Sequence, residues 1–205
     1  MKRAVVLIGV GEMGGVFARG FLKAGHPVYP IEQGTEVSSV FKEMSDPLTV
    51  IVAVGEKPLH DVLDAIPRDW RDRLILLQNE LLPRDWQAHD IANPTVISMW
   101  SEKKKGQDVK VIIPSPVFGP HAGLVKEALS AINIDCEVVA DENELLFELV
   151  VKNVYILTVN IAGLKVGGTV GELWTRHQDL AREVAEDIMD IQFRLITKEL
   201  DRQKL

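Results

Sequence analysis

Six residues near the start of the chain, Gly9-Val10-Gly11-Glu12-Met13-Gly14, decide its fold. Residues 3–9 have the apolar, β-branched composition of a buried parallel strand, and residues 12–24 have the periodicity of an amphipathic helix. In a strand–turn–helix of this kind the first glycine makes a tight turn, the second leaves room for a pyrophosphate, and the third allows close packing. The stretch therefore predicts a dinucleotide-binding corner; the alternative is a glycine-rich turn without a ligand.

Apolar strands alternate with amphipathic helices from this motif to about residue 140. Further strands are predicted at 27–31, 48–54, 74–77, 95–98, 109–113 and 137–139, and further helices at 58–66 and 120–132. Residues 115–121 are expected to form a loop. Such alternation is typical of an α/β fold of the Rossmann type, with a doubly wound parallel sheet.

The strand pattern ends at Ala140. A long helix is predicted at 141–164, then a glycine-rich turn, and then a second helix at 177–200. We therefore expect two domains: an NAD(P)-binding Rossmann domain over 1–140, and a short all-α C-terminal domain over 141–205 for substrate binding or dimerisation. Two helices cannot enclose a core of their own, so we expect a homodimer formed through 141–205.

Charge and residue composition limit the kinds of molecule that this protein is expected to bind. The 205-residue chain has a net charge of −7, which disfavours nucleic acid as a partner. The one basic run, Lys103-Lys104-Lys105, is expected to be a solvated loop, and the five histidines show no metal-ligand spacing. Cys136 is the only cysteine and is expected to be a packing residue, which fits a reducing cytoplasm.

The apolar stretch 145–164 approaches the length of a membrane span. It contains Glu148, Lys152, Asn153 and Asn160, which would be costly in lipid. The sequence therefore predicts a buried helix of a soluble protein, with no membrane as partner.

Glu32 follows the second predicted strand, at the position that selects the ribose of a dinucleotide. Its carboxylate can accept hydrogen bonds from both ribose hydroxyls and would repel a 2′-phosphate. We therefore expect an NAD(P) cofactor with NAD favoured over NADP; the alternative is that Glu32 is a surface residue.

The opening of the chain resembles that of the 6-phosphogluconate-dehydrogenase-like reductases, through Ile8–Gly15 and Lys23–Val28. Hydroxyisobutyrate dehydrogenases, pyrroline-5-carboxylate reductases and ketopantoate reductases share it. The stretch Leu76-Leu77-Gln78-Asn79 is similar to the L-Q-N-G strand end of ketopantoate reductases, with Glu80 in place of the glycine. This resemblance implies that Asn79 lies at the cofactor and substrate cleft and that Lys57 lies on the cofactor side.

The long helix resembles the start of the helical domain in the same family, where the pattern is aromatic-x-Lys-x-x-x-Asn-x-x-x-Asn and the lysine donates a proton. Two registers stay open. With Phe147 as the aromatic residue, Asn153 matches the first asparagine, but Leu149 stands at the lysine position. With Lys152 as the lysine, Asn160 matches the second asparagine.

These observations favour an NAD(P)-dependent oxidoreductase of the ketopantoate reductase-like type that transfers hydride to a small oxo-acid or related carbonyl. Lys152 is the expected proton donor, and Asn79, Asn153 and Asn160 are expected to position the substrate. On the structural alternative, Lys152 reaches solvent and the asparagines bond to each other or to the backbone. Two other functions stay open: a non-catalytic dinucleotide-binding or regulatory protein, and an imine reductase of the pyrroline-5-carboxylate reductase type.

Overall fold

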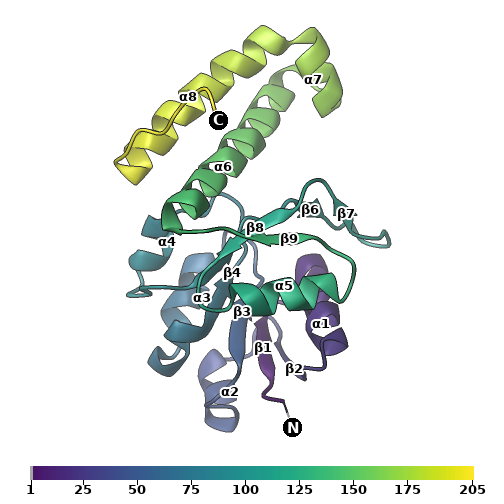
Figure 1. The fold of residues 1–205 in the computed structure, drawn as a ribbon, viewed down its shortest axis with the longest axis vertical. Helices are drawn as coiled ribbons and strands as arrows, with labels where there is room; N and C mark the ends of the chain where they lie inside the picture. Colours follow the sequence, from purple (N-terminus) through teal and green to yellow (C-terminus); the bar gives the residue numbers. More distant parts are fainter. Residues whose placement is uncertain (1) are drawn as a thin grey trace. The chain divides into compact units, whose positions relative to one another are not determined.

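The computed structural model describes residues 2–205 and divides the chain into two compact units (Figure 1). The first unit runs to Asn79 and resumes over Asp85–Leu145. The second unit consists of Leu146–Leu205 together with the short segment Glu80–Arg84. The second unit thus begins a few residues after the boundary expected from the sequence, and it also takes a segment from the middle of the chain.

A seven-stranded sheet forms the centre of the first unit. Its strands stand in the order β2 (Val28–Ile31), β1 (Val5–Ile8), β3 (Thr49–Val52), β4 (Leu74–Leu76), β5 (Thr95–Ile97), β8 (Ser115–Phe118) and β9 (Cys136–Val138). The first five are parallel, whereas β8 runs antiparallel to β5. The predicted Rossmann-type fold is confirmed, with one antiparallel step. The chain order reverses at β1, which pairs with both β2 and β3.

Helices pack on both faces of the sheet, so its central strands are buried on both sides. These helices are α1 (Glu12–Lys23), α2 (Val37–Glu43), α3 (Leu59–Ala65), a 3-10 helix η1 (Arg68–Arg73) and α5 (Ala122–Ser130). The short helix α4 (Pro83–Gln87) has residues in both units. Phe17 and Phe21 of α1 and Leu129 of α5 share one core cluster with Val5 and Leu7 of β1. The alternate residues of β1 are equally buried and point to the other face.

One strand prediction and one loop prediction were wrong. The segment expected as a strand at 109–113 contributes only β7 (Lys110–Val111), which pairs with β6 (Ser101–Glu102) in a separate two-stranded sheet. The expected loop at 115–121 instead contains β8, which lies inside the main sheet. Pro114 and Pro116 hide this strand in the sequence, since proline cannot donate to a sheet ladder. Strand β8 is held between β5 and β9 all the same.

The second unit is an antiparallel pair of long helices, α6 (Glu142–Val166) and α8 (Gln178–Ile196), joined through α7 (Val170–Arg176). Val150 and Val154 of α6 pack with Ile188, Met189 and Phe193 of α8. Within residues 2–205, α6 alone has the length and composition of a membrane-crossing helix, and 44% of its most apolar window is buried.

The short helix α7 lies in the region that was expected to be only a glycine-rich turn. Thr169 and Glu172 form a capping box at its start: the Thr169 hydroxyl accepts from the Glu172 N–H at 3.2 Å, and the Glu172 carboxylate accepts from the Thr169 N–H at 2.9 Å. This reciprocal pair satisfies two free donors of the helix end and explains a helix within a glycine-rich segment.

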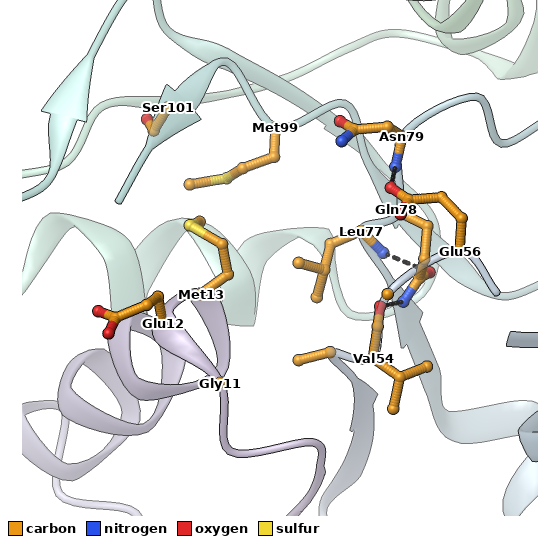
Figure 2. Close-up of a pocket in the computed structure, with 12 residues that line it drawn as sticks. Gly11, Glu12, Met13, Val54, Glu56, Leu77, Gln78, Asn79, Met99 and Ser101 are labelled. Carbon is orange, nitrogen blue, oxygen red and sulfur yellow. Dashed lines mark hydrogen bonds between the residues drawn. The ribbon is translucent and has the colours of Figure 1, made fainter. Parts of the chain in front are cut away.

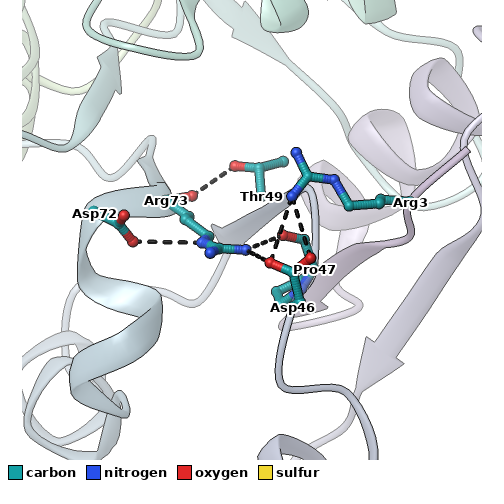
Figure 3. A network of polar contacts seen from close by, with 6 residues as sticks. All are labelled: Arg3, Asp46, Pro47, Thr49, Asp72 and Arg73. Atoms are coloured by element: carbon teal, nitrogen blue, oxygen red, sulfur yellow. Dashed lines mark hydrogen bonds and ion pairs between the residues drawn. The ribbon is translucent and has the colours of Figure 1, made fainter.

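A network of charged side chains ties together the amino ends of β1, β3 and β4 (Figure 3). The Asp46 carboxylate accepts from Arg73 and, at 3.4 Å, from Arg3. Arg73 also donates to the Pro47 carbonyl at 2.7 Å, and the Thr49 hydroxyl donates to the Arg73 carbonyl at 2.6 Å. The hydrogen bond from Arg73 lowers the pKa of Asp46 below its usual value. The network lies at the amino ends of the strands, whereas the glycine motif lies at the carboxyl end of β1.

Candidate cofactor site

The glycine motif forms the corner between β1 and α1. Gly9 has a φ of +94°, which favours glycine, and a Cβ there would lie 2.8 Å from the Ala53 carbonyl oxygen. A Cβ on Gly14 would lie 2.1 Å from the Gly9 carbonyl oxygen, so α1 crosses the turn too closely for any side chain. A Cβ on Gly11 would meet nothing within 4 Å. The first and third glycines therefore maintain the fold, and the second leaves open space.

A pocket of about 510 Å³ opens where β1 and β2 end, and we call it the Glu32 pocket. It is lined by Gly9, Val10 and Gly11 of the corner, by residues 32–35 after β2, and by residues 53–55 after β3. Glu32 is exposed there, at the place expected for a ribose selector. The described lining residues include no lysine or arginine.

A second pocket of about 310 Å³ opens on the other side of the corner, and we call it the Asn79 pocket (Figure 2). The ends of β3, β4 and β5 and the start of α1 line it, and Met13 and Met99 point toward one another across it. The two pockets share four lining residues, which are Gly11, Ala53, Val54 and Gly55. Together they form a trough across the carboxyl ends of the strands, at the point where the strand order reverses.

Gln78 and Asn79 lie at the end of β4 but use their side chains differently. The Gln78 amide donates to the carbonyls of Val52 at 2.6 Å and Val54 at 3.2 Å, and its oxygen accepts from the Leu77 N–H at 3.2 Å. Gln78 therefore fixes the ends of β3 and β4 together. Asn79 is exposed, and its backbone N–H donates to Glu56 at 3.3 Å. Its side-chain amide is one of several polar groups among the residues that line the pocket.

Several residues of this site were not predicted from the sequence. Glu56, Gln78, Met99 and Ser101 all line the Asn79 pocket. Their one sequence signal is that they follow predicted strands, since ligands of open α/β sheets bind at the carboxyl ends of strands. Lys57, in contrast, is exposed and is not among the residues that line either pocket.

The basic loop is less solvated than expected. The side chain of Lys103 is only 19% exposed, and its ammonium lies 3.2 Å from the carboxylate of Glu12 in the first turn of α1. Lys104, its neighbour, is 66% exposed. The expectation of a uniformly solvated loop is therefore wrong at Lys103, because Glu12 provides a partner distant in sequence.

The candidate residues of α6 lie in different surroundings within the second unit. Lys152 and Asn153 are 3% and 1% exposed, whereas Asn160 is exposed. The Asn153 amide donates to the side-chain oxygen of Gln192 on α8 at 3.0 Å. The two asparagines thus do not form a pair, although their spacing places them on one face of the helix.

Cysteine and metal chemistry find no support among the described residues. Cys136 is buried in the core of the first unit, as expected of a packing residue, and burial raises the pKa of its thiol to about 12. A thiol in this state is a poor nucleophile. Within residues 2–205, no group of three histidine, cysteine, aspartate or glutamate side chains is placed to hold a metal ion.

Comparison with known proteins finds similar structures but no similar sequences. No protein-family model matches the chain, and neither does any curated protein sequence. The 2-dehydropantoate 2-reductase of Methylococcus capsulatus superimposes with a TM-score of 0.67 at 13% identity, over 97% of this chain and 76% of that one. This chain has the fold of the ketopantoate reductases.

Related dehydrogenases share that fold. D-mandelate dehydrogenase, in a complex with NADH, matches with a TM-score of 0.68 at 15% identity, over 97% of this chain and 75% of that one. The dimeric ketopantoate reductase of Staphylococcus aureus matches with a TM-score of 0.65 at 16% identity, over 98% and 76%. The expected likeness to the 6-phosphogluconate-dehydrogenase-like reductases is confirmed at the level of the fold.

Proposed function

We propose that this protein is an NAD(P)-dependent reductase of the ketopantoate reductase-like type. The observation that carries the proposal is the pair of pockets that share Gly11 at the glycine corner. A dinucleotide has the matching form, two nucleoside ends joined by a pyrophosphate. The adenosine would occupy the Glu32 pocket, the pyrophosphate would lie at Gly11, and the nicotinamide would enter the Asn79 pocket. D-mandelate dehydrogenase and a pyrroline carboxylate reductase of the same fold were solved with NADH and NADP.

The cofactor supplies the hydride, and the protein supplies binding and orientation. Met13, Leu77 and Met99 give the Asn79 pocket an apolar lining suited to a nicotinamide ring. The exposed Asn79 amide is proposed to bind the substrate, a small oxo-acid or related carbonyl. Titration calorimetry with NADH tests cofactor binding, and NADH oxidation with a panel of 2-oxo acids and cyclic imines tests turnover. Absence of binding to every nicotinamide nucleotide would refute the proposal.

Glu32 is proposed to favour NAD over NADP. Its carboxylate lies at the Glu32 pocket, whose described lining has no lysine or arginine to neutralise a 2′-phosphate. We expect NADH to bind at least about tenfold more tightly than NADPH, because two like charges would meet without a counter-ion. Glu32→Ser is expected to reduce that preference. Equal affinities in the unmodified protein would contradict the assignment.

Lys152 is the proposed proton donor to the carbonyl oxygen. It is 3% exposed, and an ammonium group can give a proton to a carbonyl oxygen that receives a hydride. Asn153 and Asn160 are proposed to orient the substrate. We expect Lys152→Met to lower kcat by about 100-fold or more with NADH affinity unchanged. Lys165→Met, at an exposed position on the same helix, is the control.

One observation favours a second function, a non-catalytic dinucleotide-binding or regulatory protein. The Asn153 amide is already bonded to Gln192, so this asparagine has a structural partner. Tight NADH binding without turnover of any panel substrate, together with no effect of Lys152→Met, would favour this alternative over the reductase.

A homodimer through residues 141–205 is proposed as the working form. The second unit exposes large apolar side chains near the α6–α7 turn: Ile161, Leu164, Val170 and Trp174, with Leu164 at 89%. The ketopantoate reductase of Staphylococcus aureus with this fold is dimeric. Light scattering at micromolar concentration is expected to give twice the chain mass, and Leu164→Asp is expected to lower it. A monomeric mass for the unmodified protein would exclude this assembly.

A further inference from the structure

The β6–β7 hairpin carries the run Lys103-Lys104-Lys105 in its loop and Lys110 on β7, and three of these lysines can be compared. The Lys103 side chain is 19% exposed, whereas those of Lys104 and Lys110 are 66% and 74% exposed. Lys104 and Lys110 approach Glu102 within the same hairpin, at 3.8 Å each. Lys103 alone pairs with a residue outside the hairpin, which is Glu12.

The loop itself holds the ammonium of Lys103 in place. This group donates to the backbone carbonyl of Lys104 at 3.1 Å and to that of Gln107. Both acceptors belong to the same loop, so the position of the ammonium does not depend on Glu12. Glu12 is 43% exposed and can turn toward solvent. The ion pair with Glu12 is therefore exchangeable, while the two hydrogen bonds within the loop stay.

This ion pair reaches the Asn79 pocket through Glu12. Glu12 and Ser101, the first residue of the hairpin, both line that pocket, and Gly11 immediately precedes Glu12. Gly11 is also one of the four residues common to both pockets, where the pyrophosphate of a dinucleotide would lie. A carboxylate this close to a diphosphate opposes its binding, and an ammonium held beside it favours binding.

We infer that Lys103 is a diphosphate-binding residue of the cofactor site. Glu12 pairs with the Lys103 ammonium while the site is empty. On binding, the diphosphate replaces the Glu12 carboxylate as the acceptor for Lys103, and Glu12 turns to solvent. The hairpin thereby adds a charge-assisted contact that the glycine motif lacks. This inference rests on the proposed cofactor binding and extends it to a residue far outside the motif.

The test compares Lys103→Gln with Lys104→Gln, which removes the same charge from the same loop. NADH and ADP-ribose are titrated calorimetrically into each full-length variant, because both ligands contain the diphosphate and only one contains the nicotinamide. We expect Lys103→Gln to weaken both ligands by the same factor, about 10-fold to 100-fold, and Lys104→Gln to weaken them less than twofold. Lys103→Arg is expected to restore most of the affinity. Glu12→Gln is expected to bind both ligands more tightly, since the competing carboxylate is gone.

Four outcomes would overturn the inference. Equal affinity of Lys103→Gln and the unmodified protein would show that Lys103 does not contact the ligand. A loss for NADH alone would place Lys103 at the nicotinamide instead of the diphosphate. Weaker binding by Glu12→Gln, equal to the loss in Lys103→Gln, would make the ion pair a structural support. Failure of the unmodified protein to bind either ligand would refute the proposed function as well, and that result is read before any variant is compared. Thermal unfolding of each variant without ligand checks that the fold is intact.

Discussion

The two units of this protein hold their candidate functional groups in different ways. In the first unit the cofactor site is made mainly of backbone, since the corner at Gly9, Gly11 and Gly14 gives it its form and Gln78 serves to hold strand ends together. In the second unit the candidates are side chains of one helix, and one of them, Asn153, is bonded to a residue of α8. A backbone site needs only a few glycines after a strand. A site of helical side chains depends on every neighbour of each group.

This difference explains why the likeness to known reductases is clear at the glycine corner and imperfect on α6. The form of the corner depends on the absence of a side chain at Gly9 and Gly14. On α6, Lys152 and Asn153 are both buried, so each must find an environment that pays the cost of removing a polar group from water. The hydrogen bond from Asn153 to Gln192 provides such an environment, and this bond can stabilise the fold as well as orient Asn153 for a substrate.

The largest effect is expected from Gly14→Ala, which tests whether the corner is as rigid as its contacts imply. The new Cβ would lie 2.1 Å from the Gly9 carbonyl oxygen, which is backbone and cannot turn aside. We expect a loss of about 3 kcal/mol in the free energy of unfolding and no measurable NADH binding. Urea unfolding and calorimetric titration measure the two quantities.

Gly11→Ala is the matched control for that change. A Cβ there meets nothing within 4 Å, and the φ of −67° suits alanine, so the free energy of unfolding is expected to stay the same. NADH binding is expected to weaken, because the new methyl group would occupy space needed by the pyrophosphate. If Gly11→Ala binds NADH as well as the unmodified protein does, the pyrophosphate does not lie at Gly11.

A smaller effect is expected in the second unit from Asn153→Leu. This change leaves the buried side-chain oxygen of Gln192, a residue 3% exposed, without its donor, at a cost of about 1–3 kcal/mol. The double variant Asn153→Leu with Gln192→Leu is expected to recover part of the loss, since no polar group is then left unpaired. A change in KM for Asn153→Leu with unaltered urea unfolding would instead place Asn153 at the substrate. Both units would then contribute groups that bind a ligand.

The sequence predicted the first unit well because its signals are local. The strand at β1, the glycines after it and the apolar periodicity of α1 are all read within some two dozen residues. Contacts between residues distant in sequence could not be predicted. Gln192 lies 39 positions from Asn153, and Glu56 lies 23 positions from Asn79. The same holds for Lys103, whose partner Glu12 belongs to another element.

Strand β8 shows the same limit within the first unit. Its pairing with β5 and β9 fixes it as a strand, whereas Pro114 and Pro116 predict a break. Prediction from local sequence patterns therefore fails where contacts with residues distant in sequence determine the structure. Both the β6–β7 hairpin and α6 depend on such contacts. The glycine corner is predicted by its own six residues, even though Gly9 packs against the distant Ala53.

The smallest effect is expected at the opposite edge of the sheet, from Asp46→Asn. The pKa of Asp46 is lowered in the folded state, first by its hydrogen bond from Arg73, so the charged carboxylate stabilises the fold at any pH above the usual value of 3.8. That contribution is lost as the pH falls through the lowered pKa. Asp46→Asn should therefore be less stable than the unmodified protein near neutral pH, and the difference should shrink in acid.

Salt separates this exposed network from the buried contacts of the corner. Asp46 is 64% exposed, so about 1 M salt is expected to reduce the difference between Asp46→Asn and the unmodified protein. Asp69→Asn, which removes an exposed carboxylate of η1 outside this network, is the control. A loss of stability at Asp46 that is independent of both pH and salt would mean that the carboxylate acts by shape and hydrogen bonding alone. Charge would then contribute nothing to holding the amino ends of β1, β3 and β4 together.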